Sequence, residues 1–293
     1  MKKIMLFLAV AGIMAACNND NEVLNEPQYI TEFKAVFSGA DSRIAAEASD
    51  AGLKFSWEEG DILYVYNPSD ENDYFEYKYN STSGIFVLES ASKTDGGMTV
   101  NEAYFATTQI LYDGSYTTVD GDFAVKTEFY DEGVTNIPLI SGLFLAKADG
   151  TIAPMHHTVG VVEIPVKLGA GSTITELGGV GIYKESAHVI GEFYATPKSP
   201  YYAGIIEDGD FFEESSTWQG ATLNESTPVS FFIPMLPGEY TNPSLFFANE
   251  DGDFVTDEVQ LTGTLTIECG KVTRLPEQVL TLSGASGPSS GEK

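Results

Sequence analysis

The chain has 293 residues, enough for one large domain or two ordinary ones. Its 43 acidic residues outnumber its 15 basic ones and give a net charge of −28. A surface this acidic repels phosphate backbones and anionic membrane surfaces, so we expect no nucleic-acid partner. Two cysteines, Cys17 and Cys269, are too few for a disulfide framework.

The first 16 residues have the pattern of a signal peptide. Lys2 and Lys3 supply a positive start, and an uncharged, mostly apolar run follows from Ile4 to Ala16. Its 13 residues match a signal-peptide core and are too few to span a bilayer as a helix.

The end of this run, Met14-Ala15-Ala16-Cys17, resembles the lipobox of bacterial lipoproteins. The resemblance implies cleavage between Ala16 and Cys17 and attachment of lipid to the Cys17 thiol. Residues 17–27 then form a polar tether, and Asn18 to Glu22 resembles the surface-export signal of Bacteroidetes lipoproteins. The expected location is the cell surface, with a lipid anchor in the outer membrane. The alternative is an ordinary signal peptide beside an incidental cysteine.

Short strands separated by turn residues are predicted through the rest of the chain. Phe55 and Trp57 alternate with polar neighbours, Glu58-Glu59-Gly60-Asp61 predicts a turn, and Ile62 to Tyr66 is apolar on both faces. Such a run is typical of a strand buried inside a sandwich. Similar runs occur at Ile30–Phe37, Gly84–Leu88, Val159–Leu168, Val180–Tyr183, Val229–Met235, Ser244–Phe247 and Leu261–Ile267. The pattern predicts an all-β chain built from β-sandwiches.

A domain boundary is expected near Asp149-Gly150, before a new series of strands. It divides the chain into an N-terminal sandwich of residues 28–150 and a C-terminal sandwich of residues 151–282. Residues 283–293 are rich in glycine and serine and predict a flexible tail.

No motif in the sequence supports catalysis. His156 and His157 are adjacent, which excludes an HExxH metal site, and on a strand they would point to opposite faces, one packed and one solvated. No P-loop and no GxSxG elbow in a structured segment occurs, and Cys269 is interpreted as a small buried apolar residue. We therefore expect no enzyme, no metal and no cofactor. Trp218 is the best candidate for an exposed aromatic residue that binds glycans, with packing of its loop as the alternative.

Three segments resemble the fimbrillin-like lipoproteins of Bacteroidetes. Phe55 to Tyr66 resembles the W-x-x-G-D-x-I-x-V-Y signature of that family, Met155 to Ile164 its histidine-containing strand, and Phe231 to Tyr240 its proline-rich segment. The resemblance assigns structural roles to Trp57, Gly60, Asp61 and His156. It also implies two transthyretin-like β-sandwich domains in tandem, surface export and assembly into fimbriae.

In such an assembly, an Arg-specific protease removes the first strand and a strand of the next subunit replaces it by β-strand addition. Arg43 follows the predicted strand Ile30–Phe37, and the chain has just one other arginine, Arg274. Cleavage between Arg43 and Ile44 is therefore expected, and it would also detach the lipid anchor. The alternative is that Arg43 is a surface residue of a loop.

The sequence thus predicts a structural subunit of a cell-surface fimbria. Its expected partners are other fimbrial subunits, the outer membrane through the lipid, and a ligand on a host or bacterial surface. Val279 to Leu282 is strand-like but short for a donor strand, and polar residues follow it. This limited donor capacity is typical of a tip or accessory subunit, and the choice among stalk, tip and accessory positions stays open. The alternative function is a monomeric surface lipoprotein that binds glycans. An exposed row of aromatic residues with a sealed first strand would favour the glycan binder, whereas a releasable first strand in a groove would favour the fimbrial subunit.

Overall fold

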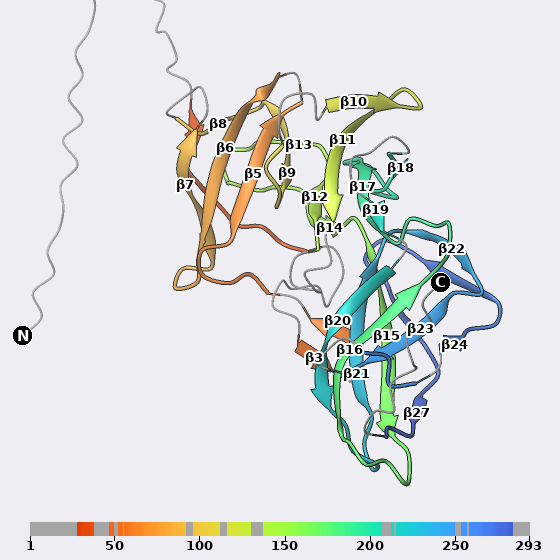
Figure 1. The fold of residues 1–293 in the computed structure, drawn as a ribbon. Coiled ribbons are helices and arrows are strands. Elements are labelled where there is room, and N and C mark those ends of the chain that lie inside the picture. Colours follow the sequence, from red (N-terminus) through yellow and green to blue (C-terminus); the bar gives the residue numbers. More distant parts are fainter. Residues whose placement is uncertain are drawn as a thin grey trace, which may run out of the picture.

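The computed structural model describes residues 28–37, 47–49, 52–54, 56–68, 70–91, 96–111, 116–129, 137–206, 212–213, 215–249, 253–256 and 258–283. Over these residues the ordered elements are strands, and Figure 1 shows them gathered in two bodies that follow each other along the chain. No helix in this part of the chain is long and apolar enough to cross a membrane. The prediction of an all-β chain with sandwiches in tandem is confirmed.

The first body is built on an eight-stranded sheet. Its strands run in the order β14 (Met155–His157), β12 (Leu139–Ser141), β9 (Ala103–Thr107), β5 (Ile62–Asn67), β6 (Asp70–Asn80), β7 (Ile85–Ala91) and β2 (Glu32–Phe33), and β13 (Phe144–Leu145) also pairs with β9. Two separate two-stranded ladders are formed by residues of the same half of the sequence: β1 (Tyr29–Ile30) pairs with β8 (Met98–Thr99), and β3 (Glu47–Ser49) pairs with β4 (Gly52–Lys54).

The second body is a sandwich of two four-stranded sheets. One contains β21 (Val229–Met235), β15 (Gly160–Leu168), β26 (Val272–Arg274) and β27 (Gln278–Leu280). The other contains β20 (Ser215–Thr222), β16 (Glu176–Tyr183), β23 (Ser244–Ala248) and β24 (Val259–Gln260), and β22 (Gly238–Thr241) pairs with β25 (Thr264–Ile267) beside them. Val162, Ile164 and Val166 of β15 are fully buried between the sheets.

A further sheet, of five strands, joins the two bodies, and we call it the linking sheet. It consists of β10 (Tyr116–Val119), β11 (Asp122–Phe129), β17 (Ile190–Ala195), β18 (Gly204–Ile205) and β19 (Phe212–Glu213). β11 and β17 pair antiparallel from Val125–Ala195 to Phe129–Gly191, side by side in Figure 1. Lys126 Nζ lies 2.9 Å from Glu192 Oε1 within this pair. Residues from before and after position 150 therefore share one sheet.

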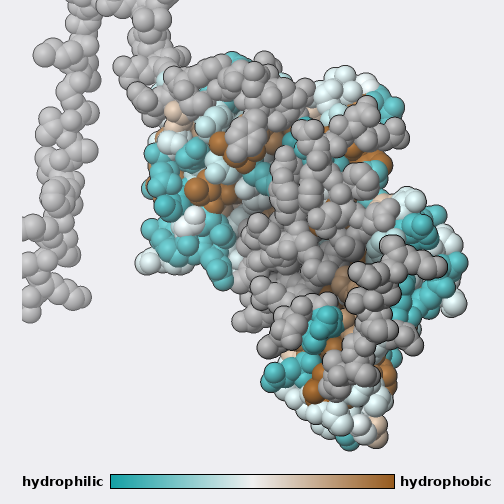
Figure 2. Space-filling model, in the orientation of Figure 1, coloured by the Kyte–Doolittle hydropathy of each residue, from teal (hydrophilic) through white to brown (hydrophobic). Residues whose placement is uncertain are grey.

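Strand β5 confirms the prediction of a strand apolar on both faces. Leu63 and Val65 point into the core of the first body, which also contains Phe75, Tyr77 and Phe86. Tyr66 belongs instead to the larger cluster that continues through the linking sheet into the second sandwich. Figure 2 shows hydrophobic residues among hydrophilic ones over β5 and β6.

The sheets cross the expected domain boundary at residue 150 twice. β14 follows this position in the sequence, yet it pairs with β12 of the first body, and β17 pairs with β11. That residues 28–150 and 151–282 are separate domains, divided near Asp149-Gly150, stays a prediction.

Candidate functional site

The first described segment closes the eight-stranded sheet, and we call residues 28–37 the N-terminal strap. Glu32 and Phe33 pair antiparallel with Val87 and Phe86 at one end of the sheet. Farther on, Phe37 forms a parallel bridge with Met155 of β14 at the other end, where the Met155 amide donates to the Val36 carbonyl at 2.7 Å. The strap therefore covers both edges of the sheet.

Some side chains of the strap are buried in the core of the first body, and those between them are exposed. Ile30, Phe33 and Ala35 are 5%, 3% and 7% exposed, whereas Tyr29 and Val36 are 43% and 44% exposed. The Phe33 ring meets the Tyr77 ring edge-on at 4.7 Å and stacks on Phe86 at 5.5 Å between centroids. Burial of apolar side chains of this size stabilises by roughly 1.5–3 kcal/mol each. The strap is thus part of the core it covers.

The protein backbone approaches the strap closely at two glycines. A Cβ on Gly97 would lie 2.7 Å from the Ile30 carbonyl oxygen, and a Cβ on Gly150 would lie 2.9 Å from that of Glu32. Both glycines have positive φ angles, 87° and 68°, which side-chain-bearing residues rarely adopt. Glycine at these two positions therefore makes room for the backbone of the strap.

A buried tyrosine ties the strap to β8. The Tyr77 hydroxyl donates to the Ile30 carbonyl at 2.6 Å and accepts from the Met98 amide at 3.0 Å. Burial raises the pKa of Tyr77, so the hydroxyl stays protonated and able to donate.

The far end of the strap lies between two of the motif segments found in the sequence. The Phe37 ring stacks on Trp57 at 4.7 Å and lies nearly parallel to the His157 ring at 6.2 Å. Trp57 also meets Phe86 edge-on at 4.9 Å. Burial, with a smaller contribution from neighbouring His156, lowers the pKa of His157 to about 4, so its imidazole is neutral at pH 7. The sequence thus indicated the residues that surround this end of the strap, although not their contact with Phe37.

His156, the histidine that the resemblance singled out, points away from the strap. Its ring stacks on Tyr201 at 3.8 Å, and burial lowers its pKa. The two histidines lie on opposite faces of β14, as expected, but His156 is half-buried against the loop after β17 rather than solvated.

Gly60 and Asp61 form the turn that leads into β5. Gly60 has a φ of 95°, and the Asp61 carboxylate accepts from the Glu58 amide at 2.7 Å. Burial is the largest effect on the pKa of Asp61 and raises it. The Tyr79 amide donates to the Asp61 carbonyl at 2.7 Å, which ties the turn to β6. These motif residues therefore form the turn that leads the chain into β5, a strand of the core.

Several predicted site residues lie outside the described residues. They are Ala16, Cys17, Arg43 and Ile44, so the expected lipidation and processing sites stay predictions. The backbone of Trp218 belongs to β20, and its side chain is outside the described part. Cys269 is partly buried, its thiol contacts the Thr158 carbonyl at 3.4 Å, and burial raises its pKa to about 12, which makes it a poor nucleophile at neutral pH.

The predicted donor strand is engaged in the second sandwich. β27 pairs in parallel with β15, and Leu280 and Leu282 are buried in the core. The Gly169 and Thr173 amides donate to the Leu280 and Leu282 carbonyls, each at 2.7 Å.

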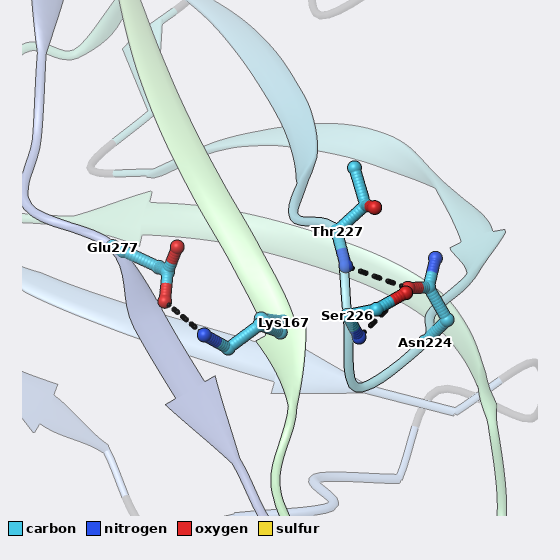
Figure 3. A network of polar contacts seen from close by, with 5 residues as sticks. All are labelled: Lys167, Asn224, Ser226, Thr227 and Glu277. Carbon is cyan, nitrogen blue, oxygen red and sulfur yellow. Dashed lines mark hydrogen bonds and ion pairs between the residues drawn. The ribbon is translucent and has the colours of Figure 1, made fainter.

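Polar contacts between side chains and backbone amides stabilise the segments around β27 (Figure 3). An ion pair of 2.7 Å joins Lys167 of β15 to Glu277, just before β27. Nearby, the Asn224 side chain accepts from the amides of Ser226 and Thr227 in the turn between β20 and β21. β27 is thus a fixed part of its own sandwich.

Comparison with known proteins finds similar structures but no matching family model and no matching curated sequence. A candidate cell adhesion protein from Bacteroides ovatus is 12% identical, with a TM-score of 0.50 over 84% of this chain and 91% of that one. A candidate cell adhesion protein from Bacteroides fragilis is 16% identical, with a TM-score of 0.45 over 91% and 92%. A fimbrial protein from Bacteroides ovatus is 10% identical, with a TM-score of 0.41 over 89% of this chain and 52% of that one. The first of these likenesses shows that the chain has the overall fold of a solved Bacteroides structure.

Proposed function

We propose that this chain is a structural subunit of a cell-surface fimbria, in which the N-terminal strap holds the place of a strand that another subunit later supplies. The observation that carries the proposal is the position of the strap, which pairs with β7 at one end of the sheet and with β14 at the other. The name of the solved structure with the same overall fold, a candidate cell adhesion protein, agrees with a role at the cell surface.

The physical basis of assembly is the open groove that loss of the strap would create. Without it, β7 and β14 lose backbone partners, and the pockets of Ile30 and Phe33 face water. Unpaired edges beside an apolar groove favour the addition of a strand. The proposed role needs no catalytic step.

Processing would release the strap. Arg43 lies six positions after Phe37, so a cut between Arg43 and Ile44 separates the strap from the sheets that it covers. The same cut frees the chain from the lipid proposed at Cys17. Until then, the lipid would hold the precursor at the outer membrane. After assembly, the subunit would lie at the tip of the fimbria or in an accessory position, where it could bind a surface ligand.

The test uses fimbriae sheared from cells that produce the chain. We expect the subunit in oligomers of high molecular mass, with Ile44 as its first residue. An Arg43→Lys variant should accumulate as a lipid-bearing precursor outside the fimbrial fraction, whereas Arg274→Lys, the matched control, should assemble. Arg274 is a suitable control because the Leu275 amide donates to the Glu163 carbonyl at 2.8 Å, which holds the bond after Arg274 in a sheet. A monomer that still begins at Cys17 in every fraction would refute the proposal.

The glycan-binding alternative gains no comparable observation. Large apolar side chains that are exposed in the described part of the chain include two aromatic ones, Tyr29 on the strap and Phe254 in the second body. They lie in different halves of the molecule and do not form a row.

A further inference from the structure

We infer that the groove selects a kinked strand from a different polypeptide, with buried side chains at positions i, i+3 and i+5 and a partly buried one at i+7. These are an aliphatic residue, an aromatic residue, a small residue and a second aromatic residue, in that order. The inference rests on the proposed function, because it names the partner that replaces the strap.

The kink follows from a change of pairing partner inside the strap. Ile30 pairs with Met98 of β8, but Phe33 pairs with Phe86 of β7. Between them, Thr31 and Glu32 both point to solvent, so the two-residue alternation of a regular strand is broken once. A regular strand that fills the Ile30 pocket would therefore turn its next apolar side chains away from the Phe33 pocket.

The backbone of the groove favours this kink. The Tyr77 hydroxyl donates to the carbonyl before the kink, that of Ile30. Gly97 and Gly150 leave room for the carbonyls on either side of Thr31, those of Ile30 and Glu32. The occupant must also run antiparallel to β7 and parallel to residues 151–155, which fixes its direction.

The pockets define the side chains. Two rings, Tyr77 and Phe86, line the Phe33 position, and two others, Trp57 and His157, flank Phe37. Flat rings fill such sites with more contact than aliphatic chains. Ala35 lies buried between these positions, where a larger side chain would overpack the core.

A second copy of this chain is a poor source of such a strand. The full spacing occurs in the sequence at the strap itself and nowhere else, and residues 258–293 contain no phenylalanine, tyrosine or tryptophan. The segment with the best partial match, Ile190-Gly-Glu-Phe193-Tyr-Ala195, is strand β17, which is paired on both sides in the linking sheet. Withdrawing β27 would also expose Leu280 and Leu282. The partner strand therefore belongs to another subunit.

The experiment uses the purified full chain with Arg274→Lys, which leaves Arg43 as its single arginine. After cutting with an Arg-specific protease, a fluorescent peptide of residues 28–37 is added in excess and its binding is followed by anisotropy. Test peptides carry Phe33→Ala or a deletion of Thr31. Control peptides carry Tyr29→Ala or Val36→Ala, because these side chains are exposed.

We expect the parent peptide and both controls to bind within a few-fold of one another. Phe33→Ala should bind about 100-fold more weakly, and the Thr31 deletion at least about tenfold more weakly. The cut chain alone should form no ladder of oligomers.

Equal binding of all the peptides would overturn the inferred spacing and leave the proposed function standing. A ladder from the cut chain alone would overturn the different-polypeptide partner, again with the proposed function intact. A cut chain that neither releases its strap nor binds any peptide would overturn both.

Discussion

Replacing Phe33 by alanine should destabilise the precursor more than any other single truncation in the strap. The ring is 3% exposed and packs between Tyr77 and Phe86, and removal of a buried phenylalanine costs about 3–5 kcal/mol. For a urea dependence of about 2 kcal/mol/M, the midpoint should fall by roughly 2 M. Val36→Ala, on an exposed side chain of the same strap, should change it by less than about 0.5 M.

Two measurements separate loosening of the strap from general damage. Urea unfolding gives the midpoints, and hydrogen exchange follows the Leu88 and Val100 amides, which donate to the Thr31 and Gln28 carbonyls at 2.9 and 3.0 Å. In Phe33→Ala these two amides should exchange faster, while those between β15 and β21 keep their protection. Equal midpoints for Phe33→Ala and Val36→Ala would refute the view that the strap completes the core.

Three further predictions concern other residues. Gly150→Ala places a Cβ 2.9 Å from the Glu32 carbonyl at a φ of 68°, so the precursor should lose about 1–3 kcal/mol of unfolding free energy in a urea titration. Burial lowers the pKa of His157 from about 6.5 in the unfolded chain to about 4 in the folded one. Its contribution to the free energy of unfolding is therefore complete above pH 6.5, and about 3 kcal/mol of that free energy is lost as the pH falls toward 4. Thermal unfolding from pH 7.5 to 4.5 should show this loss, and His157→Phe should reduce the slope. Cys17→Ser should abolish labelling of the cell-bound chain by radioactive palmitate, whereas Cys269→Ser should leave it unchanged.

Local patterns were sufficient to predict the strands that are buried on both faces. β5 carries an unbroken apolar run from Ile62 to Tyr66, and β15 carries an apolar run that only Glu163 and Lys167 interrupt. The turn at Gly60 and Asp61 has the residues that its backbone demands. The strap was also predicted as a strand. Its kink was not, because the change from β8 to β7 at Thr31 depends on residues more than 50 positions away.

The linking sheet was missed although part of its signal is local. Asp120 and Gly121 both have positive φ angles in a two-residue turn between β10 and β11, and Asp-Gly is a strong hairpin signal. What the sequence could not supply is the partner of this hairpin, since β17 lies some 65 positions farther along the chain. Gly150 likewise has a turn signal, but its close approach to Glu32 exists only in the folded chain.

The groove and the second half of the molecule meet in one short strand. On β14, His157 faces the Phe37 ring of the strap, while its neighbour His156 stacks on Tyr201, in the loop that follows β17 of the linking sheet. Adjacent residues of a strand point to opposite faces, so a strand of this kind contacts the occupant of the groove on one side and the linking sheet on the other. Under the proposed function, replacement of the strap would therefore change the packing of a strand that also contacts the loop after β17. A subunit built in this way keeps its two halves joined through β11 and β17 while the groove is open, because that pairing uses no residue of the strap.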